Sequence, residues 1–263
     1  MMKNIFWSGP HKPNWGDLLN DSLYKEITKN SGVWVDFTCD DSYYMSIGSV
    51  LEKATPRSIV WGSGFMYEDG AVNTRPLDSS FNIKAVRGPL SRKKLLQQGI
   101  ECPEVYGDPA LLYPRFYNPS IQKQYKYGIV PHYADWDNEI IEKFKNREDE
   151  GIKVINILNE NVNEFVDEVL ECEVILSSSL HGIICGDAYG IPSYWIEVSD
   201  NVLGNGFKFR DYFASVKRSD VKPYINKSDH IYDLSDLKLP KYEISIDLDL
   251  LMTKNKATKY LPL

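Results

Sequence analysis

Short apolar runs alternate with amphipathic stretches along most of the chain. The apolar runs predict strands because they are brief and rich in β-branched and aromatic residues. Stretches whose apolar residues recur three and four positions apart predict helices. In the first part of the chain, the predicted strands are residues 4–7, 33–37, 59–61 and 82–86, and the predicted helices are residues 17–29 and 89–98.

The same alternation resumes after a polar connection. Residues 114–124 carry two prolines and few apolar side chains, which is typical of a linker. Beyond it, the predicted strands are residues 127–130, 153–157, 174–176 and 194–196, and the predicted helices are residues 138–145, 162–170 and 183–189. This pattern predicts an α/β fold of two doubly wound, Rossmann-like domains, residues 1–115 and 125–230, facing a cleft. Residues 231–263 form a third segment whose placement the pattern does not predict.

The composition is that of a globular enzyme with an acidic balance. Of the 263 residues, 43% are hydrophobic and 25% are charged, enough for a sizeable core. A formal net charge of −7 argues against nucleic acid or an anionic membrane as the main partner. Any anionic ligand must therefore be held by a few local cations.

The cysteines and the apolar runs bear on metals and location. The four cysteines are far apart in sequence and form no metal-binding spacing, so we expect no metal site and a reducing compartment. No apolar run approaches a membrane-spanning length or forms a signal peptide. We predict a cytoplasmic protein without an integral membrane segment, and peripheral attachment at the inner membrane face remains open.

The most informative stretch is residues 177–192. A predicted strand leads into a serine-rich turn with Ser178 and Ser179, then His181 and Gly182, and a helix that stops before Pro192. A strand, a turn and a helix start present free backbone N–H groups and a positive dipole end, an arrangement that binds anions. A histidine there can exchange a proton with the bound group, although a lone histidine is more often structural.

Two loops of the first part have a functional and a structural interpretation. The segment Asn14-Trp15-Gly16-Asp17 follows the first strand, where α/β folds place ligand loops, but Asp17 also suits a helix N-cap. Gly62 and Gly64 form a glycine loop that falls short of a nucleotide-binding signature, so a tight turn is favoured.

Charged residues at other strand ends extend the list of candidates. Arg87 lies between a strand and a helix, where its planar fork suits a phosphate or carboxylate, although a surface ion pair is equally compatible. Asp108 follows a predicted turn and either bonds its own backbone or acts as a base. Residues 208–213 interleave charged and aromatic side chains, typical also of an amphipathic helix edge.

Taken in order, these motifs resemble the polysaccharide pyruvyl transferase family over roughly residues 1–215. The matching pieces are Asn14-Trp-Gly-Asp17, Gly62-Ser-Gly64, Arg87-Gly-Pro-Leu-Ser91, Tyr106-Gly-Asp-Pro109, Ser178-Ser-Leu-His-Gly182 with Gly190-Ile-Pro192, and Lys208-Phe-Arg-Asp-Tyr-Phe213. One departure is Ser179, where many members carry an arginine. Lys208 and Arg210 are the candidates to replace that cation.

The resemblance implies a fold like that of GT-B glycosyltransferases and transfer of a pyruvyl group from phosphoenolpyruvate (PEP) to a sugar, which can be lipid-linked. His181 is then the expected general acid, and Asp17 or Asp108 the base for the attacking hydroxyl. The expected donor-binding residues are Arg87, Ser178, Ser179, Gly182, Lys208, Gly62 and Gly64, and the expected acceptor-binding residues are Asn14, Trp15 and Tyr133.

No cofactor or metal is expected beyond PEP as the donor substrate. The helix start disfavours a second proton on His181, and a bound anion favours it, so the imidazolium should form as the donor arrives. Two alternatives remain: a GT-B glycosyltransferase using a nucleotide sugar, and a non-catalytic glycan- or nucleotide-binding module. The acceptor sugar and the oligomeric state are not predicted.

Overall fold

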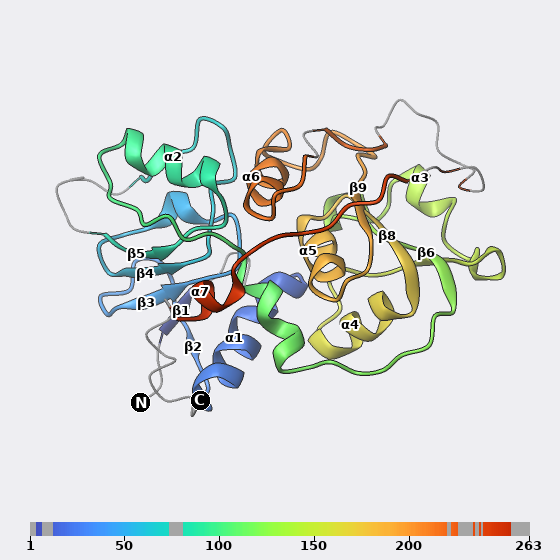
Figure 1. The fold of residues 1–263 in the computed structure, drawn as a ribbon, viewed down its shortest axis with the longest axis horizontal. Helices are drawn as coiled ribbons and strands as arrows, with labels where there is room; N and C mark the ends of the chain where they lie inside the picture. The colour runs from blue at the N-terminus through green and yellow to red at the C-terminus, as the bar shows by residue number, and fades with distance from the viewer. Residues whose placement is uncertain are drawn as a thin grey trace.

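Two parallel sheets form the framework of the protein (Figure 1). The computed structural model describes residues 4–6, 13–73, 81–219, 222–225, 234, 237 and 239–253. The first sheet has the order β2-β1-β3-β4-β5, with every neighbouring pair parallel. Its strands are β1 Asn4–Phe6, β2 Val33–Trp34, β3 Tyr43–Met45, β4 Ser58–Trp61 and β5 Asn82–Ala85. Parallel sheets whose strands alternate with helices over much of the chain confirm the predicted α/β class.

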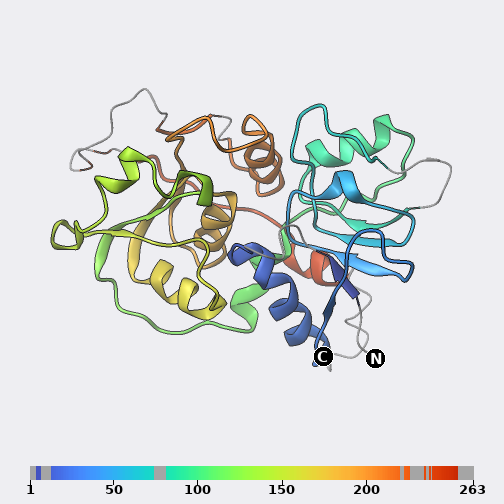
Figure 2. The same cartoon turned by 180° about the vertical axis from the view of Figure 1, so that it is seen from behind.

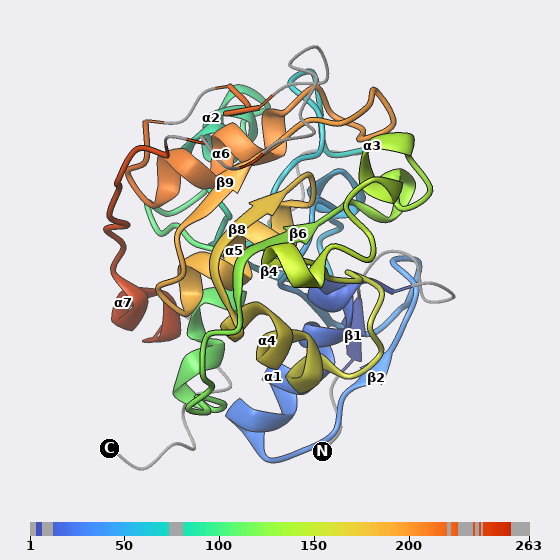
Figure 3. The ribbon, with the colours of Figure 1, turned by 90° about the vertical axis from the view of Figure 1, so that its right-hand side faces the viewer.

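The second sheet has the order β7-β6-β8-β9 and is also parallel throughout. Figure 3 views the molecule from the side of this sheet. Its strands are β6 Tyr125–Val130, β7 Ile152–Val154, β8 Cys172–Ser177 and β9 Ser193–Trp195. Residues 116–124, which contain no helix or strand, lead from the first half of the chain into β6.

Helices cover the sheets and meet between them. The longer ones are α1 Trp15–Thr28, α2 Pro89–Gln97, α4 Val162–Leu170, α5 Leu180–Ala188 and α6 Phe207–Ser215. The short ones are α3 Glu139–Glu142 and α7 Leu248–Thr253, and the 3-10 helices include η2 Pro109–Arg115 and η3 Tyr133–Asp135. One cluster of buried side chains contains residues from α1, α4, α5 and α6, so the core continues from one half of the chain into the other.

The sequence pattern located most elements but not all of their bounds. It missed β3, which has no β-branched residue and is flanked by polar residues on both sides. The predicted strand at 33–37 ends at Trp34, and the predicted helix at 138–145 shrinks to α3. Residue 7, the end of the first predicted strand, lies outside the described residues.

The end of the described chain returns to the first half of the molecule (Figures 1 and 2). Pro240 accepts a hydrogen bond from the Tyr194 hydroxyl in the second sheet. Further on, α7 packs on η2, and the backbone oxygen of Leu251 accepts a hydrogen bond from the indole of Trp61 on β4. The described part of residues 231–263 therefore spans both sheets, and the rest of that segment lies outside the described residues. In the described ranges, no helix is long and apolar enough to cross a membrane.

Each sheet has a topological switch point, where successive connections leave in opposite directions. In the first sheet it lies between β1 and β3, because β2 flanks β1 on the other side. In the second it lies between β6 and β8, because β7 flanks β6 on the other side. The loops at the carboxyl ends of these strands are where open α/β sheets bind ligands.

Candidate functional site

A pocket of about 280 Å³ lies where the two switch points meet. From the first sheet it receives the loops after β1, β3 and β4, and from the second sheet the loops after β6 and β8. The lining residues are Asn14, Asp17, Gly48, Ser49, Val50, Met66, His132, Tyr133, Ser179, Leu180, His181 and Lys208. The pocket therefore brings together several predicted site residues that lie far apart in the sequence.

His181 lies in the first turn of α5 and is tied to the start of α1. Its Nδ1 atom is 2.7 Å from Oδ1 of Asn14, the residue that caps α1. The imidazole packs closely against Gly16, where an added Cβ would lie 2.3 Å from two ring atoms. Position 16 therefore requires a glycine because the His181 ring leaves no room for a side chain, and not because of a turn. Asn14, and not Asp17, is the N-cap of the helix.

The capping bonds of Asn14 fix the tautomer of His181. The backbone N–H groups of Gly16 and Asp17 both donate to Asn14 Oδ1, so this atom is the amide oxygen. The imidazole must then donate from Nδ1, which leaves Nε2 as the proton-exchanging atom. Burial and the nearby Lys208, Arg87 and His132 lower the pKa of His181 to about 3. Burial, rather than the helix dipole invoked from the sequence, is the main cause.

Asp17 is the carboxylate that lines the pocket. Its Oδ2 accepts hydrogen bonds from the backbone N–H and the side-chain amide of Asn14, at 3.1 and 2.6 Å. Burial raises the pKa of Asp17 from 3.8 to about 7, against the lowering effect of these two bonds. A carboxyl group with a pKa near 7 suits proton exchange at neutral pH. His181 and Asp17 are thus linked through one asparagine.

We expect Asp17→Asn to stabilise the protein at alkaline pH. Folding raises the pKa of Asp17, so the wild type loses stability as the pH rises from 3.8 through about 7. Asparagine keeps an oxygen for both Asn14 donors and carries no charge. Urea unfolding should show an advantage of about 2–4 kcal/mol at pH 8.5 that shrinks towards pH 5. Asp21→Asn on the same helix is the control, and an advantage independent of pH would contradict the expectation.

Lys208 on α6 supplies the cation of the pocket. Burial and the proximity of Arg87 lower the pKa of Lys208 to about 8, with Asp135 acting in the opposite direction. The ammonium group is therefore largely charged at pH 7. Arg210, the other candidate to replace the arginine expected at Ser179, pairs with Glu68 at 3.6 Å and does not line the pocket.

Arg87 is buried behind the pocket, where it binds a carboxylate of the protein itself. Its guanidinium forms an ion pair with Asp211 of α6 at 3.0 Å, and both side chains are within 1% of complete burial. Asp211 also accepts the backbone N–H of Ser91, so it caps α2 in place of Gly88, which has no side chain. The interpretation of Arg87 as a surface residue is wrong. Arg87 does not line the pocket, but its guanidinium donates a 2.6 Å hydrogen bond to Oγ of Ser49, which does. Direct contact between Arg87 and the donor substrate stays a prediction.

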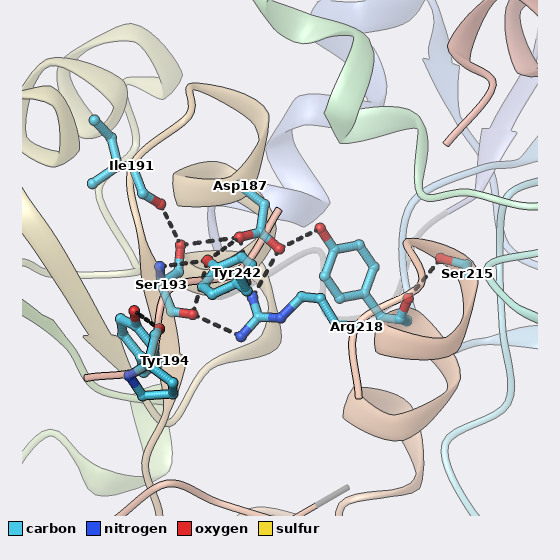
Figure 4. Close-up of polar contacts among 9 residues, drawn as sticks. Asp187, Ile191, Ser193, Tyr194, Ser215, Arg218 and Tyr242 are labelled. Atoms are coloured by element: carbon cyan, nitrogen blue, oxygen red, sulfur yellow. Dashed lines mark hydrogen bonds and ion pairs between the residues drawn. The ribbon is translucent and has the colours of Figure 1, made fainter. Parts of the chain in front are cut away.

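A second buried network fixes α5 relative to α6 (Figure 4). The carboxylate of Asp187, on α5, accepts two 3.1 Å bonds from Arg218 and one from the hydroxyl of Tyr242 at 2.5 Å. It also accepts a 2.8 Å bond from Tyr212 on α6. Because α5 carries His181 and α6 carries Lys208, this network fixes these two pocket-lining side chains relative to each other.

The serines before His181 organise the turn. Ser177 Oγ donates to the backbone oxygen of Val130 and accepts the N–H of Ser179. Ser178 Oγ donates to Asp135 and accepts the N–H of His132. Of the serines predicted to bind the donor, only Ser179 lines the pocket, and its side chain makes no capping bond to α5.

Several other predicted site residues do not line the pocket. The indole of Trp15 is fully buried against Phe165 and donates to the backbone oxygen of Val162, so the expectation that it stacks on a sugar is wrong. Asp108 is buried and bonds the N–H of Ala110, as in its structural interpretation, and burial raises its pKa to about 6.

The predicted donor-binding glycines serve close packing. A Cβ at Gly62 would meet the ring of Pro109, at Gly64 the guanidinium of Arg87, and at Gly182 the hydroxyl of Ser177. Tyr133, by contrast, lines the pocket and is about half exposed, as an acceptor platform requires.

Sequence reasoning missed His132. It lies just beyond the end of β6 and lines the pocket. Its position two residues after a predicted strand was the available signal, because ligand loops follow strand ends in this fold class. Among the described residues, no group of three or more His, Cys, Asp and Glu side chains is arranged as a metal site.

Comparison with known proteins agrees with the motif order. The sequence profile described as polysaccharide pyruvyl transferase matches residues 16–201. The chain is 29% identical over 220 residues to the succinoglycan biosynthesis protein ExoV of Rhizobium meliloti (strain 1021), covering 80% of this chain and 64% of that protein. It is 25% identical over 260 residues to the uncharacterized protein L143 of Acanthamoeba polyphaga mimivirus, covering 94% of this chain and 86% of that protein.

Proposed function

The chain belongs to the polysaccharide pyruvyl transferase family, and from this premise we propose that it transfers the pyruvyl group of PEP to a sugar, forming a cyclic ketal. One observation carries the proposal. A single pocket combines a buried cation, a histidine of fixed tautomer and a carboxyl group with a pKa near 7. PEP needs a cation for its anionic groups, an acid for its methylene carbon and a base for the attacking hydroxyl.

We propose that Lys208 and the start of α5 hold the anionic groups of PEP. The first turn of α5 has no side-chain cap, and it opens where Ser179, Leu180 and His181 line the pocket. Unpaired N–H groups at a helix start and a buried ammonium together favour a phosphate or a carboxylate. Arg87 adds positive charge behind them.

His181 is the proposed general acid. Without a donor its imidazole is neutral, because burial and neighbouring cations lower its pKa to about 3. The phosphate and carboxylate of PEP offset those cations, so His181 takes up a proton at Nε2 as the donor binds. It then delivers that proton to the methylene carbon, and C2 becomes electrophilic.

Asp17 is the proposed base for the first attacking hydroxyl. The hydroxyl oxygen bonds to C2 as Asp17 accepts its proton, giving an intermediate that still carries phosphate. A second hydroxyl then attacks C2. The bond between C2 and the bridging phosphate oxygen breaks, phosphate leaves, and the ketal ring closes. The second hydroxyl proton leaves with the phosphate. Tyr133 is the proposed platform for the sugar, and Asn14 is proposed to contact it as well as holding His181.

The proposed architecture and setting follow from the same features. The strands within each sheet are parallel, and the switch points of both sheets lie at one pocket. This supports two Rossmann-like domains arranged as in GT-B enzymes. We propose residues 1–115 and 125–230 as these domains. The buried thiols Cys102, Cys172 and Cys185 suit a reducing compartment, so we place the reaction in the cytoplasm, on an acceptor that is lipid-linked or polymeric.

Thermal unfolding with candidate donors tests the proposal. PEP at 100 times its Kd should stabilise the protein by about 2.7 kcal/mol, and a panel of nucleotide sugars should not. The stabilisation should persist in EDTA, since we propose that the transfer uses no metal. Stabilisation by a nucleotide sugar alone would indicate a glycosyltransferase, and stabilisation by a glycan without either donor would indicate a binding module.

A further inference from the structure

His132 is a second histidine in the pocket, and the steps proposed above do not use it. It follows β6 at the switch point of the second sheet, as His181 follows β8. Both imidazoles line the pocket, and the positive charge of Lys208 acts on both. The carboxyl ends of β6 and β8 thus each place one imidazole ring at the pocket.

The orientation of His132 is fixed by its own loop. It is the N-cap residue of η3, and its Nδ1 accepts the backbone N–H of Ala134 at 3.2 Å. A ring nitrogen that accepts a hydrogen bond carries no proton, so the neutral imidazole bears its hydrogen on Nε2. The ring packs against Tyr133, with 4.2 Å between the ring centroids. No described residue accepts a hydrogen bond from Nε2.

The backbone of His132 is tied to the turn that carries His181. Its N–H donates to Ser178 Oγ at 2.8 Å, and Ser178 Oγ donates to Asp135 Oδ2 at 2.8 Å. The other oxygen of Asp135 accepts the hydroxyl of Ser199. Asp135 is fully buried, so this chain of bonds holds the loop after β6 against the loop after β8.

The two histidines therefore differ in what they offer a ligand. His181 donates its Nδ1–H to Asn14, and no described residue donates a hydrogen bond to the lone pair on its Nε2. His132 accepts the N–H of Ala134 at Nδ1, and its Nε2–H has no acceptor among the described residues. Burial and Lys208 lower the pKa of His132 to about 3, so its ring is neutral at physiological pH. A neutral imidazole in this tautomer donates a hydrogen bond and has no proton-accepting nitrogen left.

We propose that His132 donates a hydrogen bond from Nε2 to an oxyanion of the bound donor, its phosphate or its carboxylate. This inference rests on the proposed function, because it takes PEP as the ligand. It assigns the two rings separate tasks: His181 moves a proton, and His132 binds and orients the anion. A hydrogen bond to a charged acceptor is strong enough for the loss of one such contact to weaken binding measurably.

Calorimetric titration of PEP into the wild type and two variants tests this assignment. His132→Gln keeps an amide N–H₂ near the place of Nε2, and His132→Phe keeps the ring but has no donor. We expect PEP to bind His132→Phe about 10- to 100-fold more weakly than the wild type, and His132→Gln within about threefold of it. Titrations of inorganic phosphate and of pyruvate should show which oxyanion loses affinity in His132→Phe.

Each other outcome overturns the assignment. Wild-type affinity in both variants would mean that His132 does not touch the donor. Equal losses in both variants would mean that the ring acts through its shape and not through its N–H. If PEP fails to bind the wild type, the proposed function fails first and this inference with it. If PEP binds the wild type and His132→Phe alike, only this inference fails.

Discussion

Replacing His181 with asparagine should lower the turnover of PEP by about 10²- to 10⁴-fold, the usual contribution of a general acid. The side chain keeps an amide that can hydrogen-bond, but it cannot deliver a proton to carbon. Lys208 and the start of α5 are untouched, so the Kd for PEP should change by no more than a few fold. The effect should therefore appear in kcat and leave donor binding almost unchanged.

Phosphate release under saturating PEP and acceptor, paired with calorimetry of PEP binding, checks this expectation. The Asp21→Asn variant is the control, because Asp21 does not line the pocket and its replacement should keep both kcat and PEP affinity. A His181→Asn enzyme with near wild-type turnover would make His181 structural. The acid would then be sought at Asp17, whose raised pKa leaves a proton available near pH 7.

Replacing Arg87 with alanine should cost about 3–5 kcal/mol of unfolding free energy, the cost of breaking a buried ion pair. The change leaves the Asp211 carboxylate buried without its counter-charge. It also removes the hydrogen bonds from the guanidinium to Ser49 and to the backbone oxygen of Phe65. Since Asp211 caps α2, the contact between α2 and α6 should loosen, and Lys208 should lose its fixed position.

Urea unfolding of Arg87→Ala and Arg210→Ala measures this difference. Arg210 is on the same helix as Asp211, but its partner Glu68 is largely exposed, so its loss should cost only about 0–1 kcal/mol. Similar losses of unfolding free energy in the two variants would show that the buried ion pair contributes no more stability than the exposed one. A stable Arg87→Ala protein that fails to bind PEP would instead favour direct contact between Arg87 and the donor.

Local sequence patterns were sufficient to predict a site residue where its expected role depends only on the strand and the helix beside it. His181 was predicted as a site residue because a serine-rich turn, a histidine and a helix follow a clear apolar run, an order typical of anion sites. Lys208 was found only through the resemblance, since an amphipathic helix edge gives the same pattern. The strand β3 was missed because it has no β-branched residue and polar residues flank it, while its burial comes from its central place in the first sheet.

The remaining differences depend on partners that sequence spacing does not reveal. A surface ion pair was the structural alternative for Arg87, but its carboxylate partner is the buried Asp211, 124 residues away. Trp15 was expected to bind the acceptor, but the contact between α1 and α4 buries it. His132 was passed over because a lone histidine has little weight until the pairing of β6 with β8 brings it beside His181.

The returning C-terminal segment bears on the order in which the protein acquires its structure during synthesis. The indole of Trp61, in the first sheet, finds its hydrogen-bond acceptor only at Leu251, 190 residues later. Gly107 is likewise covered by Ile246 and Leu251. A nascent chain leaves the ribosome from its N-terminus, so the second sheet can pair its strands while this part of the first remains uncovered. The half of the protein that is translated first is therefore the half that is completed last.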